Sequence, residues 1–383
     1  MKKMSRQRPH RKSRRKAPQS LMTLFPEYRK TKFKQKLTEK HEQYFQELSE
    51  AYKHRGLVLY LGAGVSRSIG LPGWPELIRS LTVTMMIGRV RSAIAGLGGL
   101  KEEEYWKTIL AIQEDLEGET DYDKPILMMA RAIKDQLGKT LSFEVARNLY
   151  RHLSRRKEAY YSARYQSEPG LRVPTSPLVN AIVALARSER DVKGVQGIVN
   201  YNFDDLLDEK LRRDKVKCVT VKSGHDKIPV GYLPCYHVHG VLSSKSFFDR
   251  RGYQQQGSTG NFVFSEDEYH EEYSDPYKWS NMTQMSLLGK YTGLFIGLSM
   301  EDPNIRRLID ATHRQYPDIP NYSILTRRTP LTRCADSKRT VLRNLFEDVE
   351  TSSFAKIGVK IIWVDNYEQI PRAVSRICQA SIA

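Results

Sequence analysis

The chain has 383 residues, 40% of them apolar, and a formal net charge of +18 at pH 7. This length and apolar content predict a folded protein with one large domain or two ordinary ones. No stretch approaches the roughly 18 uninterrupted apolar residues that a membrane helix needs, so we expect no contact with a membrane.

The positive charge is concentrated at the amino terminus. Residues 1–36 carry +13, whereas the other 347 residues carry only +5. Such a charge block cannot bury enough apolar surface to fold alone, so we predict that residues 1–30 form a basic, disordered arm. Two interpretations of the arm stay open: contact with nucleic-acid phosphates, and a solvated tail or assembly contact. A transit peptide is disfavoured because the segment lacks amphipathic apolar spacing.

The first part of the body predicts one strand and several helices. Apolar residues at helical spacing predict a helix over 37–52, which Gly56 ends. A buried strand at 57–61 then leads through a glycine turn into a helix at 75–86. Residues 87–191 show no convincing strand and predict an all-helical insertion, with helices at 102–116, 123–137, 142–153 and 176–188.

From residue 195 strands and helices alternate. Strands are predicted at 197–201, 218–221, 234–238, 261–265, 293–299, 322–325 and 359–364. Helices are predicted at 203–213, 266–273, 275–290, 303–315, 336–346 and 369–379. This pattern predicts an α/β fold, a Rossmann-like doubly wound parallel sheet formed by residues 31–86 and 192–383, with the helical insertion subdomain at 87–191.

The cysteines indicate the compartment. Cys218, Cys235, Cys334 and Cys378 form no CxxC pair, so we expect a reduced, cytoplasmic protein without a cysteine zinc site. Cys235, His237 and His239 alternate on one face of a strand, but such ligands spread over about 13 Å, too far for one ion. We therefore predict no metal.

Four segments leave strands with glycine or polar residues: 61–66, 199–205, 237–240 and 295–304. In a doubly wound sheet, ligands bind at the carboxyl ends of the strands, so their convergence predicts a site. Gly62 and Gly64 let a backbone approach a pyrophosphate, and Ser66 adds a hydroxyl. Close packing of the turn is the alternative. Arg67 breaks the G-x-G-x-x-G pattern and no carboxylate lies between Glu76 and Glu102, which disfavours a dehydrogenase.

The other segments carry candidate chemistry. Asn202 and Asp204 follow a strand directly, where an ordinary helix cap is the alternative interpretation. His239 is a candidate acid-base group because Gly240 frees the chain to present it in a cleft, whereas a buried structural histidine is the alternative.

Together "GAGVSRSIGLPGW", "NYNFDDLL", "HVHG" and "GLSMEDPNI" resemble the sirtuin-like NAD-consuming family, and most closely its bacterial branch of NAD hydrolases that act in defence against phage. The motifs span roughly residues 57–310. The resemblance implies that Asn202 lies against the nicotinamide ribose and the attacking water, and that His239 is the base at the ribose hydroxyls. It also implies contacts with NAD+ by Gly62, Ala63, Gly64, Ser66, Asp204, Gly297 and Ser299.

The chain departs from deacylating sirtuins in two places. It lacks their paired CxxC zinc ligands, and Gly73-Trp74-Pro75 stands where they carry Asp-Phe-Arg. We therefore predict hydrolysis of NAD+, as substrate, to ADP-ribose and nicotinamide without a metal. The resemblance further implies a homo-oligomer and a HerA-type hexameric ATPase as partner. The alternatives are a protein deacylase or ADP-ribosyltransferase, and a non-catalytic NAD-binding scaffold for a nucleic-acid-processing partner.

Overall fold

The computed structural model describes residues 30–96, 107, 111, 126–161, 174–187, 192–244, 262–327 and 336–379. The predicted arm, except Lys30, and most of the predicted helix 102–116 lie outside them. The chain separates into two units, Met1–Lys40 with Arg328–Glu350, and His41–Arg327 with Thr351–Ala383. The first unit contains the first half of α2 (Lys30–Glu50) and most of α14 (Asp336–Ala355).

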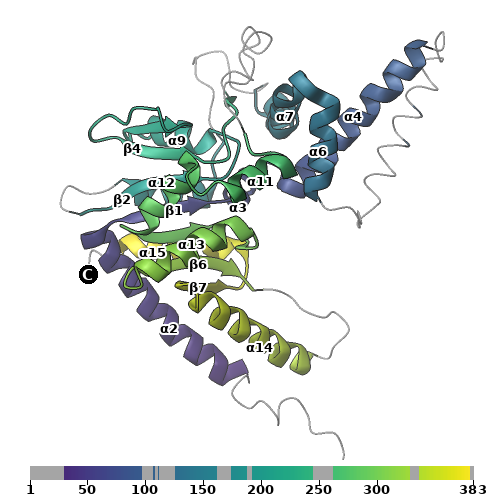
Figure 1. Ribbon diagram of the computed structural model, residues 1–383. Helices are drawn as coiled ribbons and strands as arrows, with labels where there is room; N and C mark the ends of the chain where they lie inside the picture. Colours follow the sequence, from purple (N-terminus) through teal and green to yellow (C-terminus); the bar gives the residue numbers. More distant parts are fainter. Residues whose placement is uncertain are drawn as a thin grey trace, which may run out of the picture. The chain divides into compact units, whose positions relative to one another are not determined.

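The second unit is built on one seven-stranded sheet in which every strand pair is parallel (Figure 1). The strands are β1 (Leu57–Leu61), β2 (Val195–Asn200), β3 (Cys218–Val221), β4 (Leu233–His237), β5 (Thr292–Ile296), β6 (Asn321–Thr326) and β7 (Val359–Val364). All residues of β1 and β5 are buried, as expected for central strands covered on both faces. The predicted α/β, Rossmann-like fold is confirmed.

The strand order, β3-β4-β2-β1-β5-β6-β7, places a topological switch at β1. The chain builds outward from β1 through β2 to the β3 edge, then returns to β5 on the other side of β1 and continues to β7. In such sheets a ligand crevice forms at the carboxyl ends of the strands where the order reverses. The segments after β1 and β5 therefore border the expected site.

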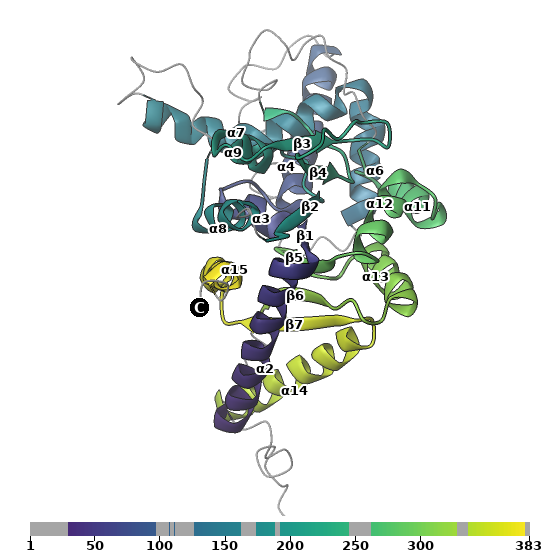
Figure 2. The same cartoon turned by 90° about the vertical axis from the view of Figure 1, so that its left-hand side faces the viewer.

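Helices cover both faces of this sheet. Figure 2 shows α8 and α15 on one side of the strands and α12 and α13 on the other. The described helices that lie wholly in this unit are α3 (Ala63–Ser68), α4 (Trp74–Gly96), α6 (Ile126–Leu137), α7 (Leu141–Tyr161), α8 (Pro177–Ala186), α9 (Leu206–Arg213), α11 (Glu266–Ser274), α12 (Trp279–Leu288), α13 (Pro303–Gln315) and α15 (Ile370–Gln379). A π-helical turn, η2 (Ala51–Arg55), joins α2 to β1, and short 3₁₀ turns lie at Gly138–Thr140 and Tyr367–Gln369.

The described part of residues 87–191 contains helices and no strand. Its helices α6 and α7 pack against α4 through buried apolar side chains, among them Ile133, Val145 and Leu149. No helix in the described ranges combines the length and the apolar character needed to cross a bilayer.

Three local predictions differ from the structure. The strand predicted at 261–265 is wrong, because described residues 262–265 belong to no strand; the Val263 N–H donates to the His239 carbonyl in the turn after β4, at 2.9 Å. Helix α4 extends ten residues beyond the predicted end at Met86, since Gly88 weakens a helix without breaking it. Helix α3 follows β1 directly, within the segment predicted as a glycine turn.

Candidate functional site

The turns after β1 and β5 are joined backbone to backbone. The Gly64 N–H donates to the Gly297 carbonyl at 2.9 Å, and Gly297 has φ +69°. A Cβ on Gly64 would lie 2.7 Å from the Gly297 Cα, and one on Gly62 would lie 2.7 Å from the Gly297 oxygen. Any larger residue at Gly62 or Gly64 would therefore collide with the backbone of Gly297, so the contact between the two turns alone requires both glycines. This geometry supports the alternative interpretation that the glycines serve close packing of the turn.

Asn202 is tied to this turn. Its side-chain amide donates to the Gly62 carbonyl at 2.9 Å, and its own N–H donates to the Asn200 side chain at 3.1 Å. Helix α9 begins after Asp205, so the helix-cap interpretation of Asn202 is wrong. With the amide nitrogen fixed by Gly62, the Asn202 side-chain oxygen stays as an acceptor.

Asp204 is a buried carboxylate bound to the same turn. Its oxygens accept the Ser66 hydroxyl at 2.5 Å and the Leu206 N–H at 3.3 Å. Burial raises the pKa of Asp204 from 3.8 to about 6, and the neighbouring Asp205 adds to the rise, while the Ser66 bond opposes it. The Ser66 hydroxyl, predicted to contact NAD+, donates to this carboxylate and orients it.

Aromatic side chains enclose the loop between these two residues. The Phe203 ring packs edge-on against Trp74, with centroids 6.1 Å apart, and Trp74 packs in the same way against Phe264 at 5.3 Å. The Trp of the Gly73-Trp74-Pro75 segment is therefore part of the wall around Asn202 and Asp204. Its large apolar face helps to exclude water from the loop.

His239 lies just beyond β4, which ends at His237. Gly240 adopts φ +87°, a left-handed turn that suits glycine and redirects the chain after the histidine. The imidazole is buried between the rings of Tyr201 and Tyr269, at centroid distances of 5.1 and 5.6 Å. Among the described residues nothing forms a hydrogen bond with its ring nitrogens.

The protonation of His239 follows from this setting. Burial lowers its pKa, and the carboxylates of Asp302 and Glu272 offset this only in part. A neutral imidazole at pH 7 can accept a proton, as a general base must.

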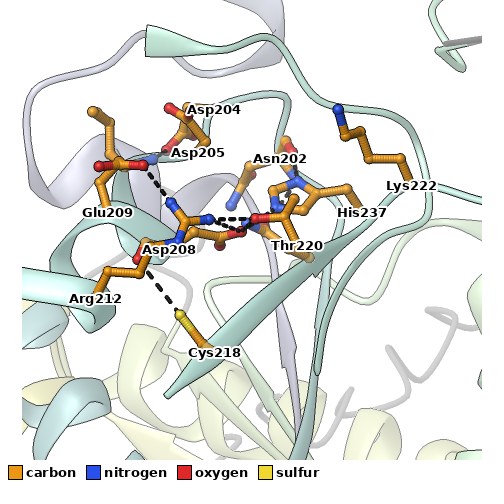
Figure 3. A network of polar contacts seen from close by, with 12 residues as sticks. Asn202, Asp204, Asp205, Asp208, Glu209, Arg212, Cys218, Thr220, Lys222 and His237 are labelled. Atoms are coloured by element: carbon orange, nitrogen blue, oxygen red, sulfur yellow. Dashed lines mark hydrogen bonds and ion pairs between the residues drawn. The ribbon is translucent and has the colours of Figure 1, made fainter. Parts of the chain in front are cut away.

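His237 belongs to a different network, shown in Figure 3. Its Nε2 lies 3.1 Å from the Asp208 carboxylate, and its Nδ1 lies 3.4 Å from the Asn202 carbonyl. The Thr220 hydroxyl donates to the same Asp208 oxygen at 2.6 Å. Burial disfavours the charge on His237, but Asp208 outweighs it and raises the pKa of the histidine.

The sequence did not indicate this network. Asp208 lies on α9, four residues after Asp204, and this spacing is typical of the polar face of an ordinary helix. Asp208 comes within hydrogen-bond distance of His237 on β4 only in the folded chain. Because His237 contacts the backbone of Asn202, it helps to hold that loop in place.

The remaining predicted residues contribute less. Ala63 is the half-buried first residue of α3. Ser299 is exposed, and its hydroxyl accepts the Glu301 N–H at 3.4 Å, which closes a local turn. Among the described residues no group of three or more histidine, cysteine or acidic side chains is arranged to hold a metal ion. Cys218 and Cys235 lie on the neighbouring strands β3 and β4, and the Cys218 thiol donates to the Asp208 carbonyl at 3.7 Å.

Three hydrogen bonds thus join the predicted motifs into one site: Gly64 with Gly297, Asn202 with Gly62, and Ser66 with Asp204. Residues 196–349 match the family model of the SIR2-like domain. The matched SIR2-like segment contains Asn202, Asp204, His239 and Gly297, and the fold adds the turn after β1. No curated protein matches the chain. The SIR2-like match supports a sirtuin-like use of NAD+.

Proposed function

We propose that this chain hydrolyses NAD+ to ADP-ribose and nicotinamide. The observation that carries the proposal is that two candidate groups follow the neighbouring strands β2 and β4: Asn202, fixed by the Gly62 carbonyl, and a buried His239 that has no hydrogen-bond partner among the described residues. A site that activates water requires an oriented acceptor to position the water and a neutral base to take its proton.

The chemistry assigns one role to each side chain. Cleavage of the glycosidic bond passes through an oxocarbenium-like state, in which the C1′–N bond breaks and nicotinamide leaves as a neutral molecule. The Asn202 oxygen accepts a hydrogen bond from the attacking water and holds it near C1′. As the new C1′–O bond forms, one proton passes through the ribose hydroxyls to His239. The Asp204 carboxylate accepts the N–H of the nicotinamide amide.

A nicotinamide-release assay with purified protein tests this proposal. Hydrolysis requires only NAD+ and water, whereas a deacylase requires an acyl-lysine peptide and a transferase requires a protein acceptor. Release that depends on either acceptor would select those alternatives. Binding of NAD+ without any turnover, measured on the complete assembly, would select the non-catalytic scaffold.

We further propose a biological setting for the activity. Free NAD+ cleavage is lethal to a cell, so a chain with this chemistry fits an antiphage effector that stays inactive until triggered. The motif resemblance to the bacterial branch supports a cytoplasmic homo-oligomer larger than a dimer that docks onto a HerA-type hexameric ATPase. Light scattering of the chain, alone and with the ATPase, tests this; a monomer that the ATPase leaves unchanged in mass contradicts it.

The same proposal requires no metal. It rests on an asparagine, an aspartate and a histidine, and the sequence has no paired CxxC motif. Metal analysis of pure, active protein tests it. Stoichiometric zinc, together with loss of turnover after chelation, would contradict it.

A further inference from the structure

Basic side chains collect at the edge of the sheet opposite the candidate site. Because all seven strands are parallel, residues that precede the strands share one edge. Lys53 precedes β1, Lys193 precedes β2 and Lys217 precedes β3. Backbone bonds hold these positions at the edge: the Lys193 N–H donates to the Lys53 carbonyl at 3.0 Å, and the N–H of Leu233, the first residue of β4, donates to the Lys217 carbonyl at 2.8 Å.

Helix α9 extends this row. It runs back from the carboxyl edge of β2 and ends at Arg213, just before β3, so Arg213 and Lys215 lie at the same edge. We call Lys53, Lys193, Arg213, Lys215 and Lys217 the amino-edge basic surface. All of these residues except the half-buried Lys53 are exposed.

The charge of this surface is largely unneutralised. Asp214 is paired with Lys210 at 2.8 Å and lies 3.5 Å from Arg187, and Glu50 lies 3.9 Å from Lys53. Within the described part of the chain, no carboxylate lies within ion-pair distance of Lys193, Arg213, Lys215 or Lys217. Glu189 and Asp191, which precede β2 in the sequence, lie outside the described residues.

Lys215 occupies a position that favours glycine. Its φ is +64°, and the bonds from Lys215 N–H to the Arg212 carbonyl and from Val216 N–H to the Leu211 carbonyl, 3.1 and 2.9 Å, form the turn that commonly ends a helix. An L-residue other than glycine is strained there. The chain therefore keeps a cation at a position where glycine would be more stable.

We propose that the amino-edge basic surface binds the phosphate backbone of nucleic acid. The cations precede different strands and so form an extended row of positive charge. Such a row is complementary to a polyanion whose negative charges repeat at regular intervals. A lipid surface would also require inserted apolar side chains, and the exposed apolar side chains before β4, Ile228, Val230 and Tyr232, are confined to one loop. Lysines act on phosphates as point charges, so we expect binding without base preference. The surface lies at the other end of the strands from Asn202 and does not depend on the proposed NAD+ chemistry.

Fluorescence anisotropy with a labelled 30-base-pair DNA duplex and the full chain, at several salt concentrations, tests this. The edge variant is Lys193→Ser/Lys215→Ser/Lys217→Ser, and the matched control, which removes three exposed cations from other faces, is Arg131→Ser/Lys139→Ser/Arg372→Ser. Each lost phosphate contact lowers the slope of log K against log salt by about 0.9. We expect the edge variant to lose about two to three units of slope and at least tenfold in affinity, and the control to change little.

The basic arm is present in both variants, so its own binding cancels. A second variant separates binding from folding: Lys215→Gly is expected to raise the melting temperature by about one to three degrees while it weakens DNA binding severalfold. The proposal is overturned if the edge variant keeps the slope of the control. It is also overturned if Lys215→Gly keeps its DNA affinity, or if the edge substitutions weaken binding to anionic lipid vesicles but not to DNA.

Discussion

The Ser66 hydroxyl donates a hydrogen bond to the Asp204 carboxylate at 2.5 Å, across 138 residues of sequence. This bond joins the segment after β1 to the segment after β2 and compensates a charge that burial disfavours. Asp204 keeps a raised pKa of about 6 despite it, with burial as the main cause. A carboxylate that is costly to the fold and yet retained at a strand end is a candidate for function.

Asp204→Asn should therefore separate stability from activity. Because the folded pKa exceeds the unfolded value of 3.8, the protonated form favours folding, and this contribution is lost as the pH rises from about 4 to about 6. Above pH 6 the buried charge costs on the order of 3 kcal/mol, which the neutral amide removes. Urea unfolding should show a stabilised variant at pH 8 and a smaller gain at pH 5, while NAD+ turnover falls. Equal destabilisation at both pH values would contradict this.

Ser66→Ala should move the pH dependence of turnover. The hydroxyl lowers the pKa of Asp204, so its removal raises that pKa. If the proposed site requires the carboxylate, kcat/KM falls as the pH drops below about 6 in the parent, and the fall begins at a higher pH in the variant. A full pH profile of nicotinamide release measures this. An unshifted profile would show that another group sets the acidic limb.

Gly64→Ala tests the contact between the two turns. The added Cβ meets the backbone of Gly297 at 2.7 Å, so the strand ends must separate, at a cost of roughly 1–3 kcal/mol. Gly88→Ala is the matched control, because nothing lies within 4 Å of that Cβ and the change should stabilise α4 by about 1 kcal/mol. Thermal unfolding compares the two variants, and opposite signs are expected.

His237→Ala should cost more than lost packing. It removes the nearest cationic partner of Asp208, whose carboxylate is buried, has one oxygen already without a hydrogen bond, and otherwise contacts Thr220 and, at 3.9 Å, Arg212. Breaking such a pair typically costs about 3–5 kcal/mol. The double variant His237→Ala/Asp208→Ala should recover part of this loss, as a denaturation cycle would show. Additive losses would mean that the two side chains act independently.

The sequence predicted the sheet well because buried parallel strands are short apolar runs between helices, as at 57–61, 218–221 and 359–364. It failed at 261–265, where "NFVFS" has the composition of a strand although described residues 262–265 contribute to an aromatic wall instead. It also placed Asn202, Asp204 and His239 at strand ends. It missed the roles of Ser66 and His237, because their partners, Asp204 and Asp208, become neighbours only through the order of the strands.

Nicotinamide release from NAD+ by the complete assembly is the measurement that tests the proposed function most directly, with Asn202→Ala and His239→Ala run beside the parent and thermal unfolding recorded for each. Asn202 caps no helix, so its substitution should leave the melting temperature near that of the parent while turnover falls at least a hundredfold. His239→Ala should likewise remain folded and lose a factor of about 10² to 10⁴. Near-parental turnover by His239→Ala, or losses that follow unfolding in both variants, would contradict the assignment of these residues and the hydrolysis with it.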